Sequence, residues 1–202
     1  MRVCIVGGGL TGAAAAATIR QRLPEAHIEL WDKAKRFGGR MCTKQSPSEP
    51  LGCSVDVGAQ YISSSPENYT RHCMDYTALV SAGVLQPLAC RVTGDRHAAD
   101  TRHFVAPRGM TQVVQHFVSS ANCQHRLEAE VSSVDSCPRE HGCRWRVATT
   151  AGTNGDFDVV LLTLPVPQML ALHGEALHSA IDEVEGLREG LCKVQYSSRF
   201  CL

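Results

Sequence analysis

The sequence predicts an α/β fold in which a parallel sheet is joined by a β-meander, and three observations support it. The first 32 residues alternate a strand pattern, a helix pattern and a second strand pattern. A glycine-rich turn separates the first strand from the helix. Between residues 129 and 164, three further strand patterns follow one another with turn residues between them. The first two strands are expected to be parallel because a helix crosses over between them.

The composition is that of an ordinary globular protein. The chain has 202 residues, 44% hydrophobic and 20% charged, which excludes a disordered chain. Its 20 Lys and Arg residues balance 20 Asp and Glu residues, so charge offers no reason to expect binding to nucleic acid or to anionic membranes. Ten cysteines include no C-x-x-C pair, and we expect mostly reduced thiols.

Two charge-free stretches could be mistaken for targeting segments. Residues 3–19 resemble a signal peptide with the alanines at 13–17 as its cleavage region, but three consecutive glycines at 7–9 interrupt the apolar run. Residues 159–172 are too short to span a bilayer and contain two prolines. We therefore expect no cleaved leader and no membrane span. A cytoplasmic location and secretion without an evident signal peptide both stay open.

The elements of the first unit each have a local cause. Residues 2–6 include β-branched Val and Ile, which favour a strand. Residues 11–23 are rich in alanine, the strongest helix former, and Pro24 ends this helix. Residues 27–32 then form a second strand candidate.

The remaining chain predicts a loop, two longer helices and several strands. Apolar residues at helical spacing predict helices over 67–82, with Gly83 as its stop, and over 110–120. A weaker helix is expected over 177–187. We also expect a loop over 34–53 and extended chain over 56–62, 86–107 and 194–202. The meander strands are expected over 129–134, 144–150 and 157–164, with a turn at 138–142 between the first two. The last meander strand is almost continuously apolar, so we expect both its faces to be buried.

A dinucleotide-binding motif follows the first strand. Gly7, Gly9 and Gly12 satisfy G-x-G-x-x-G, where they permit the tight turn, the approach of a pyrophosphate and close packing of the helix on the strand. The helix N-terminus offers free N–H groups to phosphates. Asp32 closes the second strand 20 residues after Gly12, where its carboxylate can accept hydrogen bonds from ribose hydroxyls. Strand, turn, helix and acid together predict a Rossmann-like domain.

The loop after Asp32 can be interpreted in two ways. Gly38, Gly39 and Arg40 combine a flexible backbone with a cation suited to diphosphate recognition. Several lysines and arginines nearby also fit an ordinary solvated basic loop. Spacing alone favours the solvated loop.

These motifs together resemble the FAD-binding signature of the amine-oxidase-type flavoproteins. The resemblance extends to residues 56–61, and five further segments at 31–34, 39–41, 104–109, 162–167 and 196–199 resemble one oxidase branch of that family. It covers essentially the whole chain. It implies bound FAD, held in a Rossmann-like FAD-binding domain of residues 1–61 and 107–165. A partial α+β substrate domain would comprise residues 62–106 and 166–202.

The resemblance also implies roles for individual residues. Thr11 and Arg40 would lie near the phosphates, Asp32 at the ribose, Gln60 and Tyr61 towards the flavin ring, and Val131 at the adenine. The implied reaction oxidises the 2- and 6-dihydro isomers of NAD(P)H to NAD(P)⁺ and reduces O₂ to H₂O₂. Hydride transfer needs no protein acid or base, so no catalytic residue is nominated.

Two alternative functions stay open, and the chain departs from the family pattern in its length. The chain could be a monoamine (catecholamine) oxidase, or a secreted, non-catalytic signalling protein that acts through a cell-surface receptor. Members of the branch continue well beyond residue 196, so the chain is expected to be a C-terminally incomplete form that binds flavin weakly or not at all. A metal site at Cys137, His141 and Cys143 is not favoured because a fourth ligand is missing. His97 and His103 are expected to face solvent, and Ser63 lacks a hydrolase motif.

Overall fold

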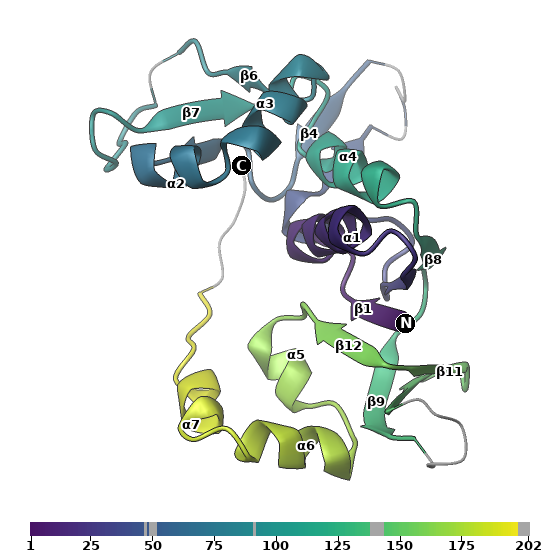
Figure 1. The fold of residues 1–202 in the computed structure, drawn as a ribbon. Helices are drawn as coiled ribbons and strands as arrows, with labels where there is room; N and C mark the ends of the chain where they lie inside the picture. The colour runs from purple at the N-terminus through teal and green to yellow at the C-terminus, as the bar shows by residue number, and fades with distance from the viewer. Residues whose placement is uncertain (47, 49–51, 91, 138–143, 198–202) are drawn as a thin grey trace.

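A four-stranded parallel sheet forms the centre of the computed structural model, which describes residues 1–46, 48, 52–90, 92–137 and 144–197 (Figure 1). Its strands are ordered β12 (Val159–Leu162), β1 (Arg2–Val6), β2 (His27–Trp31) and β8 (Gln124–Arg126). Every neighbouring pair is parallel. The predicted α/β class and its parallel sheet are confirmed.

Two helices cover one face of this sheet, α1 (Leu10–Arg22) and α4 (Thr111–Ala121) (Figure 1). Ala13 and Ala16 of α1 are fully buried, and their small side chains let α4 pack closely against α1. The apolar face of α4 supplies Val113 and Val114 to the same core. Arg20 donates to the carbonyl of Ala121 at 3.0 Å, so α1 also binds the C-terminal end of α4.

The other face of the sheet packs on the meander of β9 (Val131–Ser136), β10 (Trp145–Thr149) and β11 (Asn154–Phe157). The expected strand 157–164 is wrong as a single element, because it is divided at Asp158 between the meander and the parallel sheet. Asp158 turns the chain by accepting the backbone N–H of Arg2 at 2.6 Å. Burial on both faces is also wrong, since β12 is an edge strand and Val159 is 41% exposed.

Other boundaries differ where local pattern was weak. The helix expected over 67–82 is two helices, α2 (Pro66–Arg71) and α3 (Cys73–Ser81), with a break at His72, and Gly83 follows with φ +64°. Residues 56–62 are not one strand but lie between β4 (Ser54–Asp56) and β5 (Ile62–Ser64). The loop 34–53 also contains η1 (Gly39–Met41) and β3 (Thr43–Gln45). The predicted turn at 138–142 lies outside the described residues, as does the end of the tail expected over 194–202.

A smaller antiparallel sheet combines β5, β7 (Arg102–Val105) and β6 (Gln86–Pro87) beside α2 and α3 (Figure 1). The rings of Tyr69, Tyr76 and Phe104 stack between these helices and the sheet. Ser63 and His103 are opposite each other on β5 and β7, and their side chains lie 2.9 Å apart. The expectation that His103 faces solvent is wrong, because Asp95 binds its other ring nitrogen at 3.0 Å and leaves the side chain 17% exposed.

The C-terminal part adds three short helices, α5 (Val166–Leu170), α6 (Glu175–Asp182) and α7 (Leu187–Cys192). The helix expected over 177–187 corresponds to α6, which ends five residues earlier than expected. The sequence pattern did not predict α5, which begins directly after Pro165. Across the described residues, none of the helices is long and apolar enough to span a membrane.

Asp135 of β9 holds the N-terminus of α6, which makes a pH effect predictable. Its Oδ1 accepts the backbone N–H of Ser136 at 2.8 Å and of Ala176 at 3.1 Å, and these bonds lower the pKa of Asp135. Because the folded pKa is depressed, this stabilisation is present above the unfolded value of about 3.9 and is lost as pH falls through the folded value. Asp135→Asn should destabilise the chain by about 0.5–1 kcal/mol at pH 7 and have little effect at acid pH.

Urea unfolding at pH 7 and at low pH measures this difference. Asp100→Asn, at an exposed position, is the matched control and should change stability at neither pH. An Asp135→Asn effect of equal size at both pH values would contradict a charge-dependent role.

Candidate functional site

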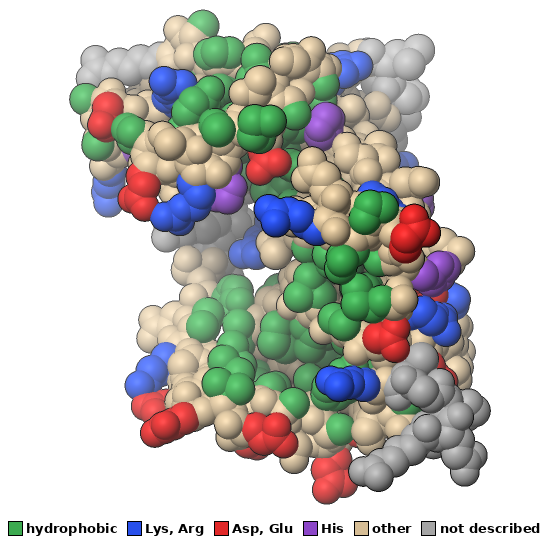
Figure 2. All heavy atoms as spheres, in the orientation of Figure 1, with side chains coloured by type: hydrophobic (Ala, Val, Ile, Leu, Met, Phe, Trp, Pro, Cys, Tyr) green, Lys and Arg blue, Asp and Glu red, His purple; other side chains and the backbone are tan. Residues whose placement is uncertain are grey.

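A cavity of about 780 Å³ opens where the carboxyl ends of β1 and β2 meet the N-terminus of α1. This edge of a parallel sheet is where open α/β folds bind ligands. Figure 2 shows hydrophobic side chains gathered in a hollow beside β12 and α5. The lining combines apolar groups with ten polar or charged side chains: Thr11, Asp32, Lys33, Arg40, Glu130, Ser132, Thr150, Thr163, Gln168 and His173.

The glycine turn shapes one wall of the cavity. Gly7 has φ +116° and donates its N–H to the carbonyl of Trp31 at 2.8 Å. A Cβ on Gly9 would have no heavy atom nearer than 4.0 Å among those it could meet, so the backbone there is open to a ligand. Helix α1 has no side-chain cap and no acidic residue in its first turn. Its terminal N–H groups and positive dipole end are therefore suited to a diphosphate.

Asp32 stands at the tip of β2 with its carboxylate fixed by the backbone. Its Oδ2 accepts the N–H of Gly8 at 2.5 Å, and its Oδ1 accepts the N–H of Ala34 at 2.7 Å. Each carboxylate oxygen retains a further acceptor position. The side chain lines the cavity, so these positions are available to a pair of hydroxyl groups.

The loop that carries Arg40 lies directly across the glycine turn. Gly38 donates its N–H to the carbonyl of Gly8 at 3.0 Å, and an isolated parallel bridge joins Gly38 to Gly9. Gly39 has φ +54°, and a Cβ there would lie 3.2 Å from the Cα of Gly9. Arg40 lines the cavity. Spacing favoured a solvated loop, and Arg40 is indeed exposed, but the structure sets the backbone of this loop against the glycine turn at the edge of the cavity.

Six of the nine residues predicted for the site line this one cavity: Gly7, Gly9, Thr11, Asp32, Arg40 and Val131. Gly12 is buried behind the turn, where a Cβ would lie 1.9 Å from the carbonyl oxygen of Gly7. Gln60 and Tyr61 are not among the lining residues. Gln60 is exposed, and the ring of Tyr61 packs edge-on against His103 at 5.7 Å. Their assignment to the flavin end stays a prediction.

The structure adds lining residues that the sequence did not single out. Thr163 follows β12, and its hydroxyl donates to the carbonyls of Val6 and Gly7 at 3.0 and 3.1 Å, which ties β12 to the glycine turn. Trp31 and His173 also line the cavity. Its position as a polar residue directly after an apolar strand was the sequence feature that could have identified Thr163 as a site residue.

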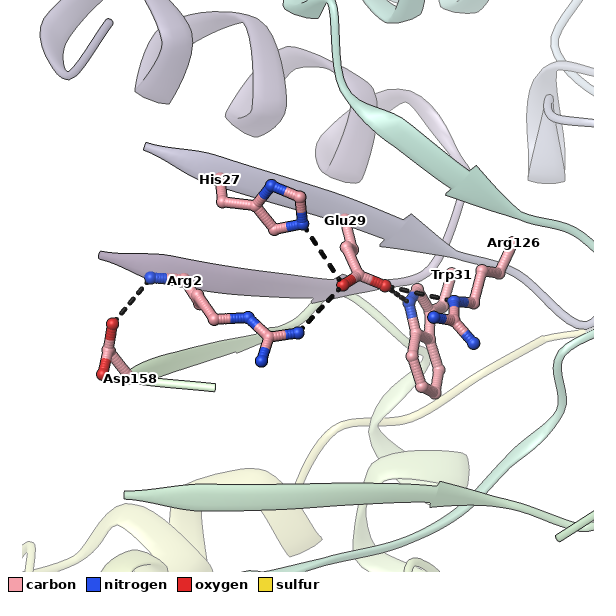
Figure 3. Close-up of polar contacts among 6 residues, drawn as sticks. All are labelled: Arg2, His27, Glu29, Trp31, Arg126 and Asp158. Atoms are coloured by element: carbon pink, nitrogen blue, oxygen red, sulfur yellow. Dashed lines mark hydrogen bonds and ion pairs between the residues drawn. The ribbon is translucent and has the colours of Figure 1, made fainter. Parts of the chain in front are cut away.

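Beneath the cavity, a buried carboxylate holds the side chain of Trp31 (Figure 3). Glu29 is 2% exposed, and its Oε2 accepts from the indole N–H of Trp31 at 3.0 Å and from Nε of Arg126 at 3.1 Å. Its Oε1 lies 3.4 Å from Nη2 of Arg2 and 3.5 Å from Nε2 of His27. The charge of Glu29 is thus compensated on both oxygens, as burial requires.

Within the part of the chain that the structure describes, no three His, Cys, Asp or Glu side chains come close enough to hold a metal ion. Two of the candidate ligands, His141 and Cys143, lie outside that part.

Comparison with known proteins agrees with this geometry. Residues 5–77 match the model of an NAD(P)-binding Rossmann-like domain, and residues 90–200 match that of the flavin containing amine oxidoreductases. Renalase of Mus musculus is 37% identical over 202 residues, which are all of this chain and 57% of that protein. The resemblance of the sequence to that oxidase branch is confirmed.

A solved structure shares the fold. The crystal structure of a protein described as a protoporphyrinogen oxidase from Exiguobacterium superposes with a TM-score of 0.62 at 15% identity, covering 85% of this chain and 61% of the other. Because the amine oxidoreductase model matches more than half of the residues, the chain belongs to the family of flavin-containing amine oxidoreductases.

Proposed function

We propose that this chain binds FAD and forms part of an FAD-dependent oxidase. One observation carries the proposal: the uncapped N-terminus of α1, the carboxylate of Asp32 and the loop of Arg40 meet in a single cavity. An anion-binding helix end next to a ribose-binding acid is the arrangement that a dinucleotide requires. Membership of the flavin-containing family and 37% identity to renalase support FAD as that dinucleotide.

The residues present fit this cofactor. The N–H groups at the start of α1 bind the diphosphate, Gly9 lets it approach the backbone, and Arg40 adds a positive charge. Asp32 accepts the ribose hydroxyls, and Val131 offers backbone groups to the adenine. When bound, FAD supplies the two-electron chemistry, and the protein orients its rings and excludes water. Residues 1–61 and 107–165 would hold the cofactor, with 62–106 and 166–202 on the substrate side.

The proposed substrates are the 2- and 6-dihydro isomers of NAD(P)H, oxidised to NAD(P)⁺ while O₂ is reduced to H₂O₂. This proposal rests on the relationship to renalase, of which the chain spans 57%. Among the described lining residues, Trp31 is the one Phe, Tyr or Trp side chain. This part of the chain therefore gives amine oxidation, which calls for an aromatic cage, no specific support.

Asp32→Asn tests cofactor binding directly. Charge-assisted hydrogen bonds are worth about 1.5–3 kcal/mol. In Asp32→Asn the hydrogen bonds to the ribose lose this charge assistance. The affinity of the purified chain for FAD, measured by quenching of flavin fluorescence, should fall about 10- to 100-fold. Asp100→Asn is the matched control and should bind like the wild type. A folded Asp32→Asn variant with wild-type affinity would refute the proposed site.

A further inference from the structure

We propose that Asp56 is a positioning residue for the FAD-binding loop, acting on Arg40 through Thr43 and Thr111. The inference rests on the proposed function and adds to it. Asp56 does not line the cavity, so any effect on the cofactor must be transmitted through other residues. A continuous set of hydrogen bonds provides the connection.

Asp56 begins this set at the N-terminus of α4. Its Oδ1 accepts from the hydroxyl of Thr43 at 2.5 Å and from the backbone N–H of Met110 at 2.9 Å. A carboxylate at a helix N-terminus is favoured by the helix dipole, and it also satisfies one of the free N–H groups there. One oxygen atom thus joins the hairpin of β3 and β4 to α4.

Thr43 and Thr111 complete the set by binding each other twice. The backbone N–H of Thr43 donates to Oγ1 of Thr111 at 2.6 Å, and the backbone N–H of Thr111 donates to Oγ1 of Thr43 at 3.1 Å. The hydroxyl of Thr111 then donates to the carbonyl of Met41 at 3.0 Å. Each hydroxyl therefore both donates and accepts, so neither can rotate without breaking a bond.

The residues after Asp56 hold the backbone of Arg40 itself. The N–H of Ala59 donates to the carbonyl of Arg40, and the N–H of Val57 donates to that of Cys42, both at 2.9 Å. A Cβ on Gly58 would lie 2.0 Å from the carbonyl oxygen of Arg40, so the two segments are in close backbone contact. The loop of Arg40 is held between residues 56–59 on one side and the glycine turn on the other.

Helix α4 depends on this arrangement because it lacks a local cap. Its N-cap residue, Met110, has no capping side chain, and no acidic residue lies in the first turn. A serine or aspartate at that position would cap the helix without linking it to the loop. Here Asp56 and Thr43 take that role from a distant part of the chain. The position of the loop is thereby coupled to α4, whose apolar face is buried in the core.

A double-mutant cycle on FAD affinity separates positioning from general stabilisation. Asp56→Ala, which removes the accepting oxygen, and Arg40→Met should each weaken FAD binding about tenfold, and the double variant should bind no more weakly than Arg40→Met alone. If the two effects multiply, Asp56 acts independently of Arg40 and the inference is wrong. Thr111→Ser keeps the hydroxyl and should retain wild-type affinity, whereas Thr111→Val should lose about as much as Asp56→Ala. The threonine pair answers the same question if Asp56→Ala does not fold.

Trypsin cleavage after Arg40 provides a readout that needs no cofactor. In Asp56→Ala, cleavage at Arg40 should rise about tenfold relative to cleavage at Lys35, because the loop opens locally. Wild-type protein that binds no FAD would refute the proposed function and leave this comparison to decide the inference. Unchanged relative cleavage at Arg40 would overturn the role of Asp56, whatever the affinity for FAD.

Discussion

Replacing Gly12 with alanine is expected to remove measurable FAD binding and to destabilise the chain. The added Cβ would lie 1.9 Å from the carbonyl oxygen of Gly7 and 3.1 Å from Oγ1 of Thr163. Neither neighbour can yield cheaply, since Gly7 binds Trp31 through its N–H and accepts the hydroxyl of Thr163 through its carbonyl. Relief therefore requires a shift of the glycine turn, which is the wall that the diphosphate must approach.

Two opposing effects decide the sign of the stability change. Alanine gains about 1 kcal/mol over glycine inside a helix. Overpacking costs typically about 1–3 kcal/mol, and a clash with backbone belongs at the upper end of that range. The steric cost wins, so the free energy of unfolding should fall, together with a loss of FAD affinity of more than about 100-fold.

Gly190→Ala is the matched control because it makes the same change in α7, where a Cβ would meet nothing within 4 Å. It should be neutral or stabilising by up to about 1 kcal/mol, with unchanged FAD affinity. Urea unfolding and flavin titration of both variants measure the difference. Wild-type affinity in Gly12→Ala would show that the turn does not approach the cofactor.

Glu29→Gln is expected to cost about 1–3 kcal/mol of stability, because the buried side chain loses its charge-assisted hydrogen bonds while the cations that remain, Arg2 and Arg126, are partly exposed. The amide cannot accept on both sides, so it places N–H groups against either Arg126 and Trp31 or Arg2 and His27 (Figure 3). Arg126 also stacks on the ring of Trp31 at 4.9 Å. Loss of the carboxylate therefore weakens the positioning of both Arg126 and Trp31.

The same variant should alter the cavity, because Trp31 lines it. Tryptophan fluorescence of the folded protein should change, and urea unfolding should show the lost stability. Glu25→Gln, on the exposed turn before β2, is the control and should stay within about 0.5 kcal/mol of the wild type. A stability loss below about 1 kcal/mol for Glu29→Gln would show that the pairing is not a major source of stability.

Much of the cofactor site was predictable because it is local in sequence. The strand, glycine turn, helix and Asp32 occupy 32 consecutive residues, and each has its own signal in period, composition or spacing. The glycines and Arg40 formed a recognisable pattern, but the sequence could not decide whether they bind phosphate, since basic residues next to glycines are common on protein surfaces. Strand β8 left no signal because its three residues, Gln124 to Arg126, are all exposed and polar.

The βαβ unit and the glycine turn with its acidic partner could be predicted from the amino-acid sequence, since these features depend on neighbouring residues, and the flavin-binding fold could be predicted from motifs shared with a known family. The division of the chain at Asp158, the groups that compensate Glu29 and the contacts that hold the loop of Arg40 became visible in the folded structure. Arg126 is 97 residues from Glu29, and Thr111 is 68 residues from Thr43. Such contacts carry no spacing or periodicity, because they exist only after the sheet and its helices have packed.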